Sequence, residues 1–162
     1  GDTIALGSGA SQTGFGESNT PYFLAYTPSS TQSISHDTWT TVATSNALLN
    51  DGNDFNTSTY KFTPQVAGKY FLFAGASWNG AGGSNSQYTI KKNNTESAAT
   101  QRILRVYSDS NARGGTINAF FEANGSSDYF YFQVFQSSGG SKNLRGANGG
   151  ENNFFGGFLV AT

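Results

Sequence analysis

The stretch Lys69–Trp78, KYFLFAGASW, decides the fold of this 162-residue chain. Successive side chains of a β-strand point to opposite faces of the sheet. One face of the stretch is apolar throughout: Tyr70, Leu72, Ala74, Ala76 and Trp78. The other begins with two large rings and ends in small residues: Phe71, Phe73, Gly75 and Ser77. The stretch therefore predicts a strand that is covered on both sides, by a second sheet and by a neighbouring subunit.

Two later stretches repeat this two-sided pattern. Asn153–Ala161 has Phe155 and Leu159 on one face and Phe154 and Phe158 on the other. In Asp128–Gln136, phenylalanine and valine alternate with tyrosine, glutamine and phenylalanine. Strands with two apolar faces favour a β-sandwich that oligomerises.

Short aromatic or β-branched runs, separated by turn-forming pairs such as Asn124-Gly125, continue from residue 21 to the C-terminus. Such spacing is typical of many short strands. The ten predicted strands are Tyr22–Tyr26, Thr31–Ser35, Thr38–Ala43, Ser58–Phe62, Lys69–Trp78, Gln87–Lys92, Arg102–Ser108, Gly114–Ala123, Asp128–Gln136 and Asn153–Ala161. Residues 1–20 are rich in Gly, Ser and Thr, so we interpret them as an N-terminal arm or linker before a head domain at 21–162.

The composition excludes several classes of protein. Charged residues make up 12% of the chain and the formal net charge is −1, so no basic footprint for nucleic acid or an anionic membrane is expected. The chain has no Cys, which removes disulfides and thiolate ligands. We expect no cofactor and no membrane insertion.

Three segments, in this order, resemble the globular head of the complement component one-q family, which is related to tumour necrosis factor (TNF). The first, Tyr60–Ala74, has the pattern of a Phe, a Pro two residues later and a Gly-x-Tyr that opens a long aromatic strand. The second, Asn124–Val134, is a turn followed by an Asp that opens the penultimate strand. The third is the closing Phe155–Leu159, FGGFL.

Within that family the chain looks most like members from bacteriophage virion proteins, such as tail fibres or capsid appendages. This likeness rests on sequence stretches such as NTPYF and NTSTYKFTP. The resemblance implies an all-β, ten-stranded antiparallel jelly-roll β-sandwich that forms a compact homotrimer, with one sheet facing the three-fold axis.

On this reading we assign the aromatic residues to two surfaces. The expected trimer interface holds Phe71, Phe73, Phe120, Phe154 and Phe158. The expected sandwich core holds Tyr70, Leu72, Trp78, Phe130, Phe132, Phe155 and Leu159. We also expect Gly75, Gly156 and Gly157 to permit close approach of strands at the axis.

Residues for catalysis are scarce. His36 is the only histidine and is followed by Asp37, so a general base oriented by a carboxylate is one interpretation and an exposed turn residue is the favoured one. We therefore expect no catalytic residues, and we expect that the protein is not an enzyme. Asp51 and Asp54 are a weak calcium candidate, and a turn capped by Asx side chains explains the same residues.

Long polar loops are the candidate ligand-binding elements, because jelly-roll loops gather at the ends of the sandwich. The candidate residues are Asn79, Asn85, Lys142, Arg145 and Asn148. A solvated loop without a ligand is the alternative for the same segments.

The sequence leaves three hypotheses for function. The first is a non-enzymatic trimeric head on the surface of a virion, outside the cell, which attaches to a host receptor, with a glycan expected, and contacts other virion proteins. The second is a structural trimerisation or decoration module without a receptor. The third is a secreted lectin-like recognition protein.

Overall fold

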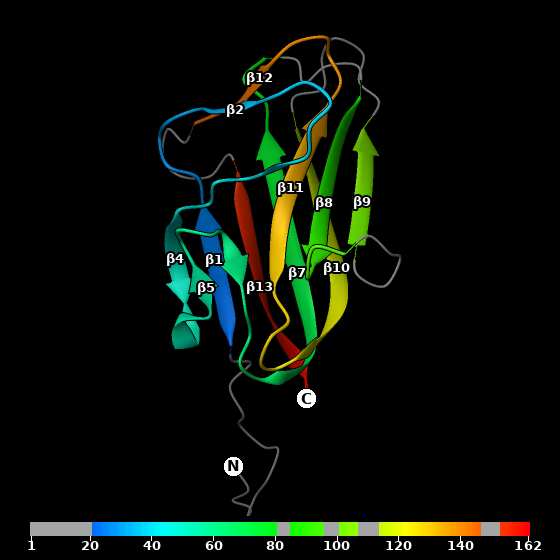
Figure 1. Cartoon of the computed structure of the whole chain (residues 1–162). Coiled ribbons are helices and arrows are strands. Elements are labelled where there is room, and N and C mark those ends of the chain that lie inside the picture. The colour runs from blue at the N-terminus through cyan, green and yellow to red at the C-terminus, as the bar shows by residue number, and fades with distance from the viewer. Residues whose placement is uncertain (1–20, 81–84, 96–100, 107–113, 147–152) are drawn as a thin grey trace, which may run out of the picture.

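The computed structural model describes residues 21–80, 85–95, 101–106 (backbone only), 114–146 and 153–162, and these form two packed antiparallel sheets (Figure 1). The first sheet has the strand order β10-β7-β13-β1-β4. Its strands are β10 (Gly114–Asn124), β7 (Ala67–Ser77), β13 (Phe154–Ala161), β1 (Tyr22–Tyr26) and β4 (Asn46–Asn50). We call it the five-stranded sheet.

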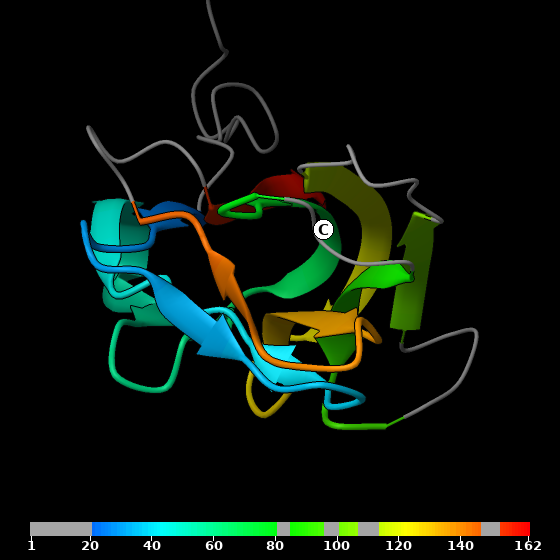
Figure 2. The same cartoon turned by 90° about the horizontal axis from the view of Figure 1, so that it is seen from above.

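The second, six-stranded sheet has the order β5-β6-β11-β8-β9, and β3 also pairs with β11. Its strands are β5 (Phe55–Asn56), β6 (Lys61–Phe62), β11 (Phe130–Gln136), β8 (Ser86–Lys92), β9 (Gln101–Val106) and β3 (Thr40–Thr41). A 3₁₀ turn, η1 (Asp51–Asn53), links β4 to β5. Figure 2, seen from above, shows the two sheets facing each other.

A separate two-stranded ribbon closes one end of the sandwich (Figure 1). It consists of β2 (Gln32–Ile34) and β12 (Lys142–Leu144), and an isolated bridge joins Trp78 to Leu144. We call this end the cap end. At the opposite, terminal end, β1 begins beside the last residues of β13, where Leu159 N–H donates to Pro21 O over 3.1 Å.

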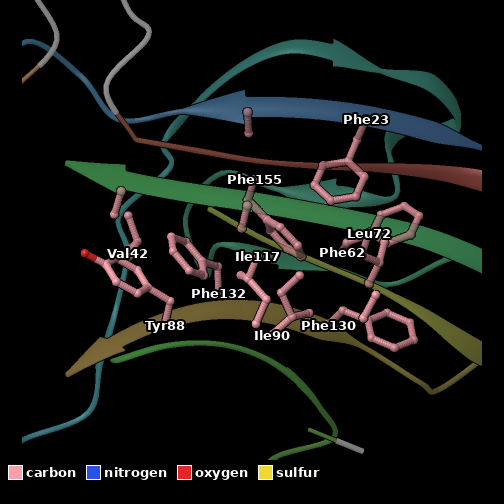
Figure 3. Packing of buried hydrophobic residues seen from close by; sticks show 14 of the residues in the cluster. Phe23, Val42, Phe62, Leu72, Tyr88, Ile90, Ile117, Phe130, Phe132 and Phe155 are labelled. Atoms are coloured by element: carbon pink, nitrogen blue, oxygen red, sulfur yellow. The ribbon is translucent and has the colours of Figure 1, made fainter. Parts of the chain in front are cut away.

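The space between the sheets is filled by aromatic rings together with aliphatic side chains (Figure 3). Phe23 stacks on Phe62 at 4.2 Å between ring centres and meets Phe155 edge-on at 4.9 Å. The predicted core is confirmed, because its seven residues are at most 7% exposed: Tyr70, Leu72, Trp78, Phe130, Phe132, Phe155 and Leu159. Trp78 also donates from Nε1 to the Tyr88 hydroxyl over 2.8 Å, which satisfies its only polar atom inside the core.

The prediction of an all-β antiparallel sandwich is confirmed, and each of the ten predicted runs contains a strand. The described residues form thirteen strands rather than ten, because β4, β5 and β12 were not predicted. β4 reads NALLN and has no aromatic or β-branched residue, so its strand conformation depends on pairing with β1. β5 and β12 are only two and three residues long.

Asp128, predicted to open the penultimate strand, lies just before β11 and ties together the turns at the terminal end. Its Oδ2 lies 2.8 Å from Lys92 Nζ and accepts the backbone N–H of Asn124 over 2.8 Å. Its Oδ1 accepts the side-chain amide of Asn93. Burial by itself raises the pKa of the Asp128 carboxyl, but Lys92, Asn93 and the Asn124 amide outweigh burial and hold the pKa below its usual value.

We therefore expect the contribution of Asp128 to the free energy of unfolding to depend on pH. A lowered folded-state pKa means that the stabilisation is complete above the unfolded-state value of about 3.9 and is lost as pH falls through the folded-state value. Denaturant unfolding from pH 7 to pH 2 should show wild type losing more stability than Asp128→Asn over this range. Parallel curves for the two proteins would contradict this assignment.

Gly157 corrects one sequence prediction, because it faces the core and not the outer side of the sheet. A Cβ at this position would lie 2.3 Å from Leu72 Cδ2 and 2.9 Å from Phe71 O. Gly157 pairs with Leu72 across the β13–β7 ladder, so the missing side chain makes room for leucine within the sandwich.

Gly157→Ala should lower the free energy of unfolding by about 1–3 kcal/mol, the usual cost of overpacking a core. The control is Gly140→Ala, because a Cβ at Gly140 would meet nothing within 4 Å. Equal unfolding midpoints for the two variants in denaturant would contradict the prediction, because they would show that the core accommodates a methyl group at Gly157.

Candidate functional site

The outer face of the five-stranded sheet carries the five phenylalanines assigned to the trimer interface, and the structure brings them together. We call Phe71, Phe73, Phe120, Phe154 and Phe158 the phenylalanine face. The Phe71 ring centre lies 5.2 Å from that of Phe120 and 5.7 Å from that of Phe158. Phe71 is paired with both residues across the β7–β10 and β7–β13 ladders, so the three rings form one row.

Two glycines shape the other half of the phenylalanine face. Phe154 pairs with Gly75, and Phe73 pairs with Gly156. A Cβ on Gly75 would lie 2.7 Å from Phe154 Cζ, and one on Gly156 would lie 2.6 Å from Phe73 Cζ. Each ring therefore lies over the glycine with which its residue is paired on the neighbouring strand, in space that a side chain at that glycine would occupy.

The apolar surface extends beyond the predicted residues onto β1 and β4. Phe120 is 61% exposed and Phe158 is 37% exposed. Tyr22, 39% exposed, pairs with Phe158, and Leu24 pairs with Leu49, which is 45% exposed. Sequence reasoning did not assign Tyr22, Leu24 or Leu49 to this surface. The alternation along β1 could have placed Tyr22 and Leu24 on the outer side of the sheet, whereas the position of Leu49 depends on the unpredicted strand β4.

The cap end gathers three of the candidate ligand residues around β12. Asn79 N–H donates to Asn143 O over 2.8 Å, and Arg145 N–H donates to Ser77 O over 2.7 Å. Lys142, at the start of β12, pairs with Ile34. Asn85 lies beside the loop between β11 and β12, because its backbone carbonyl accepts Ser137 N–H over 3.2 Å. Asn148 lies outside the described residues, as does the arm at 1–20.

Two buried side-chain amides hold the segments of the cap end in place. Asn153, 1% exposed, accepts Ser77 N–H over 2.8 Å and donates from Nδ2 to Arg145 O over 2.7 Å. Gln136 is fully buried and donates to Ile34 O over 3.1 Å and to Gly140 O over 2.9 Å. Both residues were missed as organisers of this end, because their partners are distant in sequence.

Asp51 and Asp54, the weak calcium candidate, lie at the 3₁₀ turn η1, Asp51 within it and Asp54 directly after it. Asp54 is 9% exposed, and its Oδ2 accepts Gln65 N–H over 3.1 Å. Burial raises the pKa of the Asp54 carboxyl, which the Gln65 amide partly offsets and the Asp51 charge reinforces. In the part of the chain that the structure describes, no group of three or more His, Cys, Asp or Glu side chains is placed to hold a metal ion.

His36 lies in an exposed turn at the cap end, as the favoured interpretation predicts. Its Nδ1 accepts Gly139 N–H over 3.2 Å, and its Nε2 lies 3.3 Å from Asp37 Oδ2. The Gly139 contact joins the turn after β2 to the loop after β11.

None of the helical segments within the described ranges has the length and apolar character needed to cross a bilayer.

The architecture is shared with solved structures of low sequence identity. Vertex protein P5 of the phage PRD1 is 16% identical, with a TM-score of 0.57 over 86% of this chain and 94% of that one. Eiger TNF from S. frugiperda is 14% identical, with a TM-score of 0.53 over 87% of this chain and 94% of that one. Murine APRIL is 13% identical, with a TM-score of 0.59 over 86% of this chain and all of that one.

These likenesses confirm the predicted TNF-like jelly-roll fold and include a phage protein. No protein-family profile matches the chain. No curated protein sequence matches it either.

The Asn153 amide gives a test of how the cap end is held. Asn153→Ala removes the hydrogen bonds that the buried amide makes to Ser77 N–H and Arg145 O, so the free energy of unfolding should fall by about 1–3 kcal/mol. The control is Asn143→Ala, an exposed residue of β12, which is expected to change stability by less than about 0.5 kcal/mol. Similar denaturation midpoints for the two variants would count against the role of Asn153.

Proposed function

We propose that this chain is a non-enzymatic, trimeric head domain of a phage particle that attaches to the host surface. The observation that carries the proposal is the phenylalanine face, an apolar surface on the side of the five-stranded sheet that the core does not cover. The fold likeness to vertex protein P5 of PRD1 supports the virion context.

Exposed apolar surface of this extent favours assembly. Monomeric soluble proteins rarely expose large contiguous apolar patches, and such patches mark interaction sites. Phe120 and Phe158 lie in one row with Phe71, and Tyr22 and Leu49 continue the surface across the sheet. Burial of this face around a three-fold axis is what the TNF-like resemblance implies, and it removes the rings from water.

Host attachment belongs at the cap end. The described chain begins and ends at the terminal end, so residues 1–20 would join the head to a shaft or to other virion proteins there. The cap end then projects away from the particle, at the virion surface and outside the cell. Asn79, Asn85, Lys142, Arg145 and Asn148 would contact the host receptor or glycan.

A structural role without a receptor is the second candidate. The named neighbour from a phage is a vertex protein, and that description is one of position in the particle. In this version the phenylalanine face still drives trimerisation, and the cap end only covers the sandwich.

Phe120→Glu should prevent assembly without preventing folding, because Phe120 is 61% exposed. Light scattering on wild type should give three times the chain mass of 17.1 kDa, and the variant should give a single chain. Thr59→Glu, in the exposed turn between β5 and β6, is the control and should remain trimeric. A monomeric wild type would refute the role of the phenylalanine face.

Attachment is tested on the trimer itself. Labelled wild-type domain should bind host cells and should reduce infection by competing for the receptor. A double variant, Lys142→Ala with Arg145→Ala, should show less of both effects. The control is Thr59→Ala, in the exposed turn between β5 and β6, far from both the phenylalanine face and Lys142 in the fold. A stable trimer that neither binds cells nor competes would favour the structural candidate.

A further inference from the structure

The two sheets differ sharply in charge. The strands of the six-stranded sheet carry five basic residues and no acidic one: Lys61, Lys91, Lys92, Arg102 and Arg105. The strands of the five-stranded sheet carry one of each sign, Lys69 and Glu122. The whole chain has nine basic and ten acidic residues, so more than half of its basic residues lie in the strands of one sheet.

The outer side of the six-stranded sheet also carries an aromatic stripe. Along β11 the residues that face away from the core are Tyr131, which is only 5% exposed, and Gln133 and Phe135, which are partly exposed; Tyr129 precedes them with the same alternation and is also partly exposed. The rings of Tyr129 and Tyr131 stack at 6.0 Å. A rise of about 3.4 Å per residue separates Tyr129 from Phe135 by about 20 Å. We call this surface, with Trp39 and Lys61, the β11 face.

Each end of the stripe combines a partly exposed ring with a lysine. At one end, the Lys61 ammonium lies 4.1 Å from the ring centre of Tyr129. At the other, the Trp39 ring lies 5.4 Å from that of Phe135, and the Lys91 ammonium lies 5.6 Å from the ring centre of Trp39. Trp39, Tyr129, Phe135 and Lys61 are all partly exposed, whereas Lys91 is buried.

Hydrogen-bonding groups lie between the two ends. Gln133 donates from Nε2 to Thr41 Oγ1 over 3.3 Å, and both side chains are partly exposed. The surface therefore presents flat rings, an amide, a hydroxyl and positive charge in one row. Flat apolar rings suit the C–H faces of sugar rings, the amide and hydroxyl suit sugar hydroxyls, and the ammonium suits a carboxylate or sulfate substituent.

We propose that the β11 face binds an acidic oligosaccharide several sugar rings long. A sugar ring stacks on Trp39, and an anionic substituent lies beside Lys61, which the Tyr129 ring holds in place. This inference rests on the proposed attachment function, to which it adds a class of ligand and a second surface, on the outer side of the six-stranded sheet, whose Trp39 end adjoins the cap end. A single-stranded nucleic acid could also use rings and lysines, but the net charge of −1 gives it no long-range attraction to the chain.

The two tryptophans give a direct readout. Trp78 is 1% exposed and bonded to Tyr88, whereas Trp39 is partly exposed, so quenching by acrylamide reports mainly on Trp39. A hexasaccharide of galacturonic acid should protect the fluorescence from acrylamide and should bind more weakly as salt is added. Maltohexaose, of equal length without charge, should bind about fivefold more weakly, which corresponds to about 1 kcal/mol.

Variants locate the site, with binding measured by calorimetry. Lys61→Gln and Trp39→Ala should each weaken galacturonate binding at least about fivefold, or about 1 kcal/mol. Lys69→Gln removes a lysine from the opposite sheet and should leave binding unchanged. An unchanged far-ultraviolet spectrum and Trp78 emission would confirm that the variants are folded.

Three results would overturn the inference: no protection by the galacturonate hexasaccharide at millimolar concentration, wild-type affinity in both Lys61→Gln and Trp39→Ala, or tighter binding of a hexathymidylate than of the saccharide. Trimers that bind host cells but not the saccharide would refute this inference and leave attachment at the cap end. Saccharide binding by a domain that does not attach to cells would support the β11 face and refute the proposed function.

Discussion

The structure depends on the need to cover both sides of β7. This strand pairs with β10 on one edge and β13 on the other, so it lies inside the five-stranded sheet. Its inward side chains, with Tyr70 and Leu72 fully buried, require the six-stranded sheet opposite them. Its outward rings, Phe71 and Phe73, gather the phenylalanines of both neighbouring strands. One strand thus accounts for the core and for the apolar outer face.

Alternation along the strands could be predicted from the sequence, whereas contacts between distant segments could not. Once the face of Tyr70 is fixed, the period of two places Leu72 and Trp78, and all three are buried. The same period of two places Phe71 and Phe73 together on the outer side of β7, where Phe120, Phe154 and Phe158 adjoin them. Gly157 was misplaced because we grouped it with Gly156, although adjacent residues face opposite sides. β4, Asn153 and Gln136 depend on partners far along the chain, which a single sequence does not reveal.

The outer faces of the two sheets are chemically different. Rings on the five-stranded sheet pack over glycines and beside other apolar residues, which suits a surface that excludes water. Rings on the six-stranded sheet lie beside lysines, an amide and a hydroxyl, which suits a surface that stays wet. Sequence reasoning assigned the candidate ligand-binding residues to the loops. The aromatic alternation of Asp128–Gln136 was visible, but the approach of Trp39 and Lys61 was not.

The two proposed surfaces are compatible in one assembly. The two sheets pack face to face, so their outer sides point in opposite directions. A copy that buries the outer side of its five-stranded sheet at an axis therefore directs its β11 face outward. Three copies around the axis would then present three equivalent β11 faces, with the cap ends at one end of the assembly. Weak binding at each face becomes strong attachment when a polymeric ligand contacts several copies at once. Trimerisation would thus strengthen attachment without requiring tight binding at any single site.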